Sequence, residues 1–133
     1  MFKINRKTEY ALMALEYLHN NSGQQSVRSI SNELSIPFDT LSLVLQRLNK
    51  INFVESIQGV NGGYQLKESL EKLSYLHLCE TIEKKSFFKD CVELECDYLH
   101  NCNIQGPVNK LNKKIKEYLS TIKVQDILEE KIA

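Results

Sequence analysis

Three of the chain's five glycines fall within one short stretch, Gln58–Gly63, which separates two runs with the composition of β-strands. The runs are Phe53–Ile57 and Tyr64–Leu66, and a glycine-rich connection between such runs predicts a two-stranded hairpin. The glycines themselves admit two interpretations. Either they only permit positive φ in the loop, or they also strip the tip of side chains so that its backbone amides can approach phosphate groups.

Three predicted helices precede this hairpin. Apolar residues at spacings of three and four predict helices over Tyr10–Leu18, from a cap at Ser26 to Leu34, and over about Asp39–Lys50, with Asp39 as the cap of the third. Two helices joined by a short turn form a helix-turn-helix pattern, and a hairpin directly after it is typical of a wing. We therefore predict a mainly α fold with a small β-hairpin, a winged helix-turn-helix.

Charge does not add to this prediction of a DNA-binding architecture. The chain has 17 basic and 17 acidic residues and a formal net charge of zero. The segment 1–66, which holds the predicted winged helix, carries six basic and five acidic residues. Non-specific attraction to a phosphate backbone is therefore weak, and the argument for double-stranded DNA as a partner depends on architecture.

Two further helices are predicted in the C-terminal half. The first spans Leu73–Ile82 with Ser74 as its cap, and Cys79 on its apolar face is expected to be a small buried residue. Pro107 is expected to open the second, which reaches about Thr121 and carries an apolar stripe. This stripe comprises Val108, Leu111, Ile115, Leu119 and Ile122. Periodicity alone leaves open whether it packs on its own domain or against a twofold mate.

An irregular stretch between these helices, residues 86–106, holds Cys91, Cys96 and Cys102. Clustered thiolates select zinc, copper(I) or iron–sulfur clusters. The sequence shows neither a signal peptide nor an apolar run of about 18 residues, so we expect a cytoplasmic protein outside the membrane. In a reducing cytoplasm such cysteines bind metal or respond to redox state rather than form disulfides.

These segments predict three parts of the chain. Residues 1–85 form a winged helix-turn-helix DNA-binding domain, residues 86–106 a cysteine-containing loop, and residues 107–133 a dimerisation helix and C-terminal tail, in which a short helix is expected over Gln125–Lys131. No nucleophile and base stand in a recognisable catalytic setting, so we do not expect an enzyme.

The order of these parts resembles the IscR/NsrR/CymR family of bacterial winged-helix regulators over nearly the whole chain. The residues that carry the resemblance are Thr8–Leu12, Leu45–Lys50, the wing Gln58–Leu66, and the spaced cysteines. The resemblance implies a homodimer that binds palindromic operators, with the third helix in the major groove and the wing at the adjacent minor groove. It also implies that the helix from Pro107 to about Thr121 forms the dimer.

In cluster-binding members of that family, three cysteines before the dimerisation helix hold an iron–sulfur cluster. Here Cys91, Cys96 and Cys102 stand as C-x4-C-x5-C, one residue tighter in the first gap than the usual spacing. The cluster type, 2Fe-2S or 4Fe-4S, stays open. Gln105 stands where one branch has a histidine ligand, and Glu9 stands where another branch has an acidic ligand that reaches over from the partner subunit.

Two residues within the cysteine stretch, His100 and Asp97, are local alternatives to Glu9 as the fourth ligand. Glu9 could equally be an ordinary first-turn acid that complements the helix dipole.

The resemblance and the polar leading edge of the third helix together single out candidate DNA contacts. They are Asp39, Thr40, Ser42 and Gln46 on that helix, Arg28 and Lys50 as phosphate anchors, and Gln58, Gly59, Asn61, Gly62 and Gly63 in the wing. Exposed solvated charge is the alternative reading of Arg28 and Lys50. Gln58 replaces the arginine that family members often carry there, so a weaker preference for A·T pairs is expected.

The leading hypothesis is a homodimeric transcriptional regulator, expected to be a repressor, that senses iron–sulfur, iron, redox or nitric oxide status through a bound cluster. One alternative is a structural zinc site made by the three cysteines and His100. Another is a cluster-free regulator or interaction module that answers to a partner protein.

Overall fold

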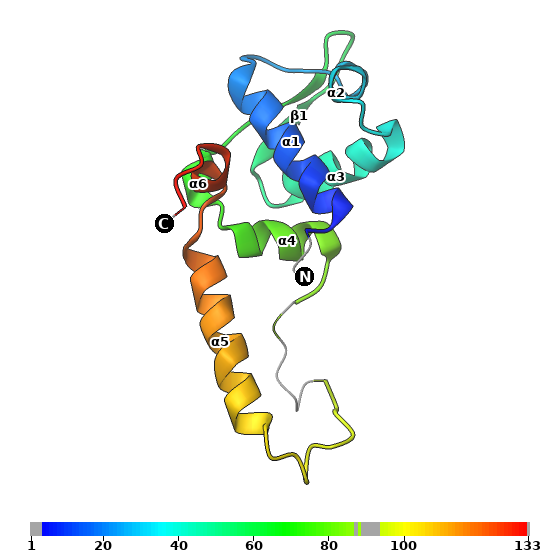
Figure 1. The fold of residues 1–133 in the computed structure, drawn as a ribbon. Helices are drawn as coiled ribbons and strands as arrows, with labels where there is room; N and C mark the ends of the chain where they lie inside the picture. Colours follow the sequence, from blue (N-terminus) through cyan, green and yellow to red (C-terminus); the bar gives the residue numbers. More distant parts are fainter. Residues whose placement is uncertain (1–3, 87, 89–93, 133) are drawn as a thin grey trace.

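The computed structural model describes residues 4–86, 88 and 94–132 of the chain and confirms the predicted fold class (Figure 1). A helical body carries one two-stranded antiparallel sheet. The elements in chain order are α1 (Arg6–Asn20), α2 (Val27–Leu34), α3 (Phe38–Lys50), β1 (Val54–Ile57), β2 (Gly63–Leu66), the 3-10 helix η1 (Leu70–Lys72), α4 (Tyr75–Glu83), α5 (Gln105–Thr121) and α6 (Val124–Leu128). None of the helices in these ranges has the length and apolar character that a membrane span needs.

The predicted serine caps are confirmed. The Ser26 hydroxyl accepts the Ser29 N–H at 3.1 Å at the start of α2, and the Ser74 hydroxyl accepts the His77 N–H at 3.1 Å at the start of α4. Each bond satisfies one of the N–H groups that a first helical turn leaves without an internal partner. A cap that the sequence analysis did not identify, Asn5, starts α1 before Tyr10 by accepting the Lys7 N–H at 2.8 Å.

Other helix boundaries also differ from the prediction. Asp39 does not cap α3, because the helix begins at Phe38 directly after Pro37, and Asp39 lies in its first turn. Pro37 has a φ of −55°, which already suits a helix start. Helix α5 begins at Gln105 rather than Pro107, which is tolerated because the first N–H groups of a helix have no internal partner.

The last helix, α6, is shorter and earlier than the predicted Gln125–Lys131. The Asp126 carboxylate accepts the Lys123 N–H at 3.3 Å, which starts the helix at Val124. Its end precedes Glu130, whose φ of 57° is left-handed and cannot continue an α-helix.

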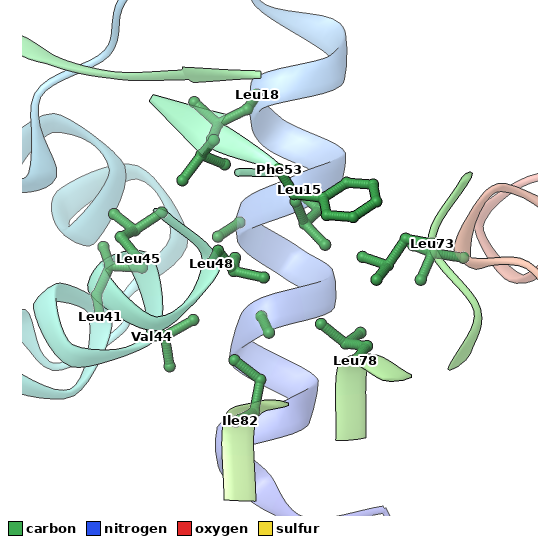
Figure 2. Packing of buried hydrophobic residues seen from close by; sticks show 14 of the residues in the cluster. Leu15, Leu18, Leu41, Val44, Leu45, Leu48, Phe53, Leu73, Leu78 and Ile82 are labelled. Carbon is green, nitrogen blue, oxygen red and sulfur yellow. The ribbon is translucent and has the colours of Figure 1, made fainter. Parts of the chain in front are cut away.

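Helix α1 runs through the middle of the hydrophobic core (Figure 2). Its small residues Ala11 and Ala14 are fully buried and let neighbouring helices approach closely. The larger side chains of Leu15 and Leu18 are buried in the same core. Leu41 and Leu45 of α3 point into this core, as do other buried side chains from α3 and α4. Each fully buried leucine contributes about 1.5–3 kcal/mol, so this core holds α3 in place.

The chain after α5 returns to the body while α5 itself projects away from it (Figure 1). Lys123 pairs with Ser74 in an isolated antiparallel bridge. The Tyr75 N–H donates to the Ile122 carbonyl at 2.8 Å, and the Val124 N–H donates to the Leu73 carbonyl at 2.8 Å. These bonds fasten the C-terminal end of α5 beside the start of α4.

Candidate DNA-binding face and cysteine site

Helix α3 buries one face in the core and exposes the opposite face to solvent. Its apolar stripe packs into the core, and this orientation leaves Asp39, Gln46 and Lys50 exposed on the opposite side, with Thr40 and Ser42 partly exposed. Spacings of three and four residues place Asp39, Ser42, Gln46 and Lys50 along one helix face. All the candidate contacts of α3 therefore reach solvent from a helix that the core holds in position.

The turn between α2 and α3 sets the angle of this helix. Ser35 adopts the left-handed conformation with φ of 56°, and its neighbour Ile36 is 2% exposed and anchors the turn in the core. The Ser31 hydroxyl donates to the Ile36 carbonyl at 2.6 Å, which satisfies a carbonyl that the turn would otherwise leave unpaired. The tight turn supports the predicted helix-turn-helix.

The hairpin is fastened to the chain segment that precedes α2. Strands β1 and β2 pair Val54 with Leu66 and Ile57 with Gly63, and Tyr64 also pairs with Gln25 through two 2.8 Å backbone hydrogen bonds. Near the tip, the Gln24 side-chain amide donates to the Asn61 carbonyl at 2.7 Å. The segment before α2 therefore holds the hairpin in place through these hydrogen bonds.

Two wing glycines are required by close backbone packing. A Cβ atom at Gly63 would lie 2.2 Å from the Gln25 carbonyl oxygen, and one at Gly62 would lie 2.3 Å from the Ile57 carbonyl oxygen. Gly59 differs, because it has open space around it and a φ of +118°. Gly63 combines a positive φ of +157° with such a close contact, whereas at Gly62 the close contact alone excludes a side chain. Gln58 is exposed beside them.

Replacing Gly63 with alanine should lower the free energy of unfolding by about 1–3 kcal/mol, the usual cost of forcing an added methyl group into a packed site. Gly106→Ala is the matched control, because nothing lies within 4 Å of a Cβ atom there. The control should be neutral or stabilising by up to about 1 kcal/mol, because alanine restricts the unfolded chain and suits a helix. Urea unfolding measures both, and equal stabilities would show that the wing accommodates a side chain.

Arg28 lies exposed in the first turn of α2, with its guanidinium carbon 5.5 Å from the centre of the Phe38 ring. Sequence reasoning singled out Arg28 but not Phe38. Phe38 opens α3 and is 45% exposed, although its position in the apolar pattern of that helix is typical of a core residue. Only the placement of α2 beside α3 brings these two side chains together.

Two of the three predicted thiol ligands line one hollow. Cys96 is exposed and Cys102 partly buried, and both border a hollow of about 410 Å³ with a mostly apolar lining at the start of α5. The other lining residues are Tyr98, Asn101, Asn103, Ile104, Gln105 and Val108. Cys91 lies outside the described residues. Within the described residues no group of three histidine, cysteine or acidic side chains meets.

The donor chemistry of this hollow fits an iron–sulfur cluster as far as the described residues extend. Two free thiols supply soft ligands beside a mostly apolar lining, and both features suit a cluster. His100 and Asp97 are exposed in the same stretch, but neither is among the residues that line the hollow.

Glu9 lies in the first turn of α1 and makes an ion pair with Arg6 at 3.0 Å on the surface. It is not among the residues that line the hollow, and the start of α1 is separated from the start of α5 within one chain (Figure 1). The arrangement is that of a first-turn acid beside a helix N-terminus. A role for Glu9 at the hollow would have to come from a second subunit.

The fourth cysteine, Cys79, is buried on α4 as predicted. Burial raises the pKa of its thiol, because the charged thiolate is disfavoured away from water. A thiol with a raised pKa is a poor metal ligand at neutral pH. Cys79 is therefore separate from the cysteines of the hollow in both position and chemistry.

Arg47 connects the candidate recognition helix to the element that precedes the cysteine stretch. Its Nη1 donates to the carbonyl oxygen of Ile82, in the last turn of α4. Its Nε is buried and has no hydrogen-bond partner among the described residues. Arg47 and Ile82 are far apart in sequence, so neither the helical period nor a local motif could have identified this contact.

Helix α5 buries none of its residues, all of which lie in the described part of the chain. Leu111 is 57% exposed and Ile115 39% exposed on one face, as the predicted stripe requires. Val108, Leu119 and Ile122 of the same stripe are partly buried, so the exposed part of the stripe lies in the middle of the helix. A partly exposed apolar face of this kind is compatible with an interface helix.

Comparison with known proteins agrees with this architecture. Residues 4–130 match the family model Rrf2, described as iron-dependent transcriptional regulator. The chain is 27% identical over 131 residues to the HTH-type transcriptional regulator NsrR of Bacillus licheniformis, covering 95% of this chain and 92% of that protein. All but a few residues of the chain therefore take part in the match.

Solved structures share the fold. The structure of CymR, the global cysteine regulator of B. subtilis, superposes with a TM-score of 0.67 at 20% identity and 98% coverage of both chains. T. potens IscR superposes with a TM-score of 0.66 at 23% identity, covering 97% of this chain and 88% of that one.

Proposed function

The chain belongs to the Rrf2 family and is a DNA-binding transcriptional regulator rather than an enzyme, and on that premise we propose that it senses iron, redox or nitric oxide status through an iron–sulfur cluster. We further propose that it acts in the cytoplasm as a homodimer on palindromic operators, as a repressor. The shared fold does not identify the signal that the protein senses, because a cysteine regulator and IscR both superpose on it.

One observation carries the proposal of a cluster: Cys96 and Cys102 border a single apolar hollow at the start of α5. Cys91 would complete the set of three thiolates. Thiolates are the usual ligands of iron–sulfur clusters, and an apolar surrounding limits the access of water and oxidants. When bound, a cluster supplies a centre that reacts with oxidants and nitric oxide and is lost when iron is scarce.

Both ends of the cysteine stretch join elements that bear on DNA binding. At one end, Gln105 and Val108 of α5 line the hollow, so ligands held there would order the start of the interface helix. At the other end, Ile82 of α4 accepts the hydrogen bond of Arg47 from α3. An ordered stretch would thereby restrict α5 and α3 together, and this is how we propose that the occupied site alters operator affinity.

The fourth ligand is proposed to be Glu9 of the second subunit, with His100 as the alternative. Glu9→Ala should make the visible absorption of the anaerobically purified protein decay faster in air, while His100→Ala leaves the decay unchanged. Glu16→Ala is the control, because Glu16 is another acid of α1. The reverse pattern, with a labile His100 variant and a stable Glu9 variant, would assign the ligand to His100.

The whole proposal is tested by anaerobic purification, a visible spectrum, metal analysis, and a DNA-binding assay before and after the iron is removed with a chelator. We expect a coloured protein that contains iron and sulfide and whose operator affinity changes on chelation. A colourless protein with bound zinc would replace the sensor by a structural zinc site. A colourless, metal-free protein that still binds its operator would be a cluster-free regulator.

A further inference from the structure

An exposed aromatic ring, that of Phe38, stands at the leading end of α3. The side chain is 45% exposed, whereas Leu41, one turn further along the same helix, is fully buried. Ile36, two residues earlier in the preceding turn, is 2% exposed. The ring is thus presented to solvent by a turn that is itself anchored.

Arg28 holds this ring from one side. Its guanidinium carbon lies 5.5 Å from the ring centre, within the range of a cation–π contact. Arg28 belongs to the first turn of α2 and Phe38 to the first turn of α3, so the contact joins the leading ends of the two helices. In a helix-turn-helix, the first turn of the second helix meets base edges while the preceding helix crosses the phosphate backbone.

The charges of α3 leave room for an apolar contact at this end. Asp39 follows Phe38 directly and is exposed, so the first turn carries a negative charge. The basic residues of α3 are Arg47 and Lys50, both in its last turn, and Arg47 already donates to Ile82. The first turn of α3 itself therefore carries no basic side chain, so the nearby positive charge comes from Arg28 of α2, and contacts without charge must supply the reading of bases.

We propose that Phe38 is a specificity-determining residue whose ring packs against the C5 methyl group of a thymine in the major groove, with Arg28 keeping the ring in place beside a phosphate. The thymine methyl is the apolar feature of the major groove, and phenylalanine is one of the side chains that contact it. The inference rests on the proposed use of α3 as the recognition helix.

The test uses the full-length protein and DNA duplexes that it enriches from a random pool. Each thymine of the enriched sequence is replaced in turn by uracil, which removes only the methyl group. One replacement in each half-site should weaken binding by the wild type about fourfold, the value of one buried methyl group. Phe38→Ala should weaken binding to the thymine duplex and lose all sensitivity to that uracil.

Two further variants separate the roles. Arg28→Ala should lower the slope of log K against log salt by about one, the signature of a lost phosphate contact, while Phe38→Ala leaves that slope unchanged. Met13→Ala, which removes an exposed apolar side chain from α1, is the control and should bind like the wild type.

Uracil replacements that leave the wild-type affinity unchanged at every position would overturn the inference, and so would a Phe38→Ala protein with undiminished sensitivity. In either case the enriched duplex would still show that the protein binds DNA with sequence specificity. Failure of the wild type to enrich any duplex would overturn the recognition role of α3 and the role of Phe38 together.

Discussion

Replacing Cys96 with alanine should give a folded, dimeric protein that has lost its visible absorption and its iron. The side chain is exposed and lies outside the hydrophobic core, so the fold should not depend on it. Its thiolate is one of the soft donors that border the hollow. Mutation of residues that only support a ligand costs about 10-fold to 100-fold in metal affinity, so loss of a ligand should cost at least as much.

Cys79→Ala is the matched control, because it removes the same chemical group from a buried site on α4. This variant should keep its colour and iron, since burial raises the pKa of the Cys79 thiol and keeps it protonated. Thermal unfolding by circular dichroism checks that both variants fold, and iron and sulfide assays follow the loss. Unchanged absorption in the Cys96 variant would remove this cysteine from the proposed site.

A carboxylate at Leu111 should dissociate the proposed dimer and abolish tight operator binding. Leu111 is 57% exposed on the apolar face of α5. In a twofold interface both subunits contribute the same residue, so a change at Leu111 enters the interface twice. Leu111→Glu would therefore bury two charges without partners, at a cost that exceeds the apolar contact it replaces. Operator affinity should fall by about 10²-fold to 10⁴-fold, the range by which two linked binding sites exceed one.

Lys113→Glu is the control for the dimer prediction, because Lys113 lies on the opposite face of α5 and the change also introduces a carboxylate. Sedimentation velocity should give a monomer for the Leu111 variant and a dimer for the control. A dimeric Leu111 variant would place the subunit interface elsewhere on the chain.

The helices and the hairpin were largely predictable from local patterns. Ser26 and Ser74 act through bonds to N–H groups three residues away, so a short window of sequence contains the whole cap. The start of α3 was predicted one residue late because Pro37 and Asp39 both suit a helix start, and proline took the cap position. Such competition between neighbouring signals shifts a helix end by one or two residues, which is the range within which helix boundaries are defined.

The sequence by itself determined the winged-helix architecture, the burial of Cys79, the amphipathic face of α5 and the presence of a cysteine-containing stretch before it, because each depends on residue type and spacing within a few turns. Only the tertiary structure decided that Gly63 must lack a side chain beside Gln25, that Arg47 donates to Ile82, and that Phe38 stands exposed beneath Arg28. Each of these contacts joins segments that helical or strand periodicity treats as independent. They are brought together by the packing of α2, α3 and α4 around α1, and close packing in three dimensions has no signature in a one-dimensional pattern.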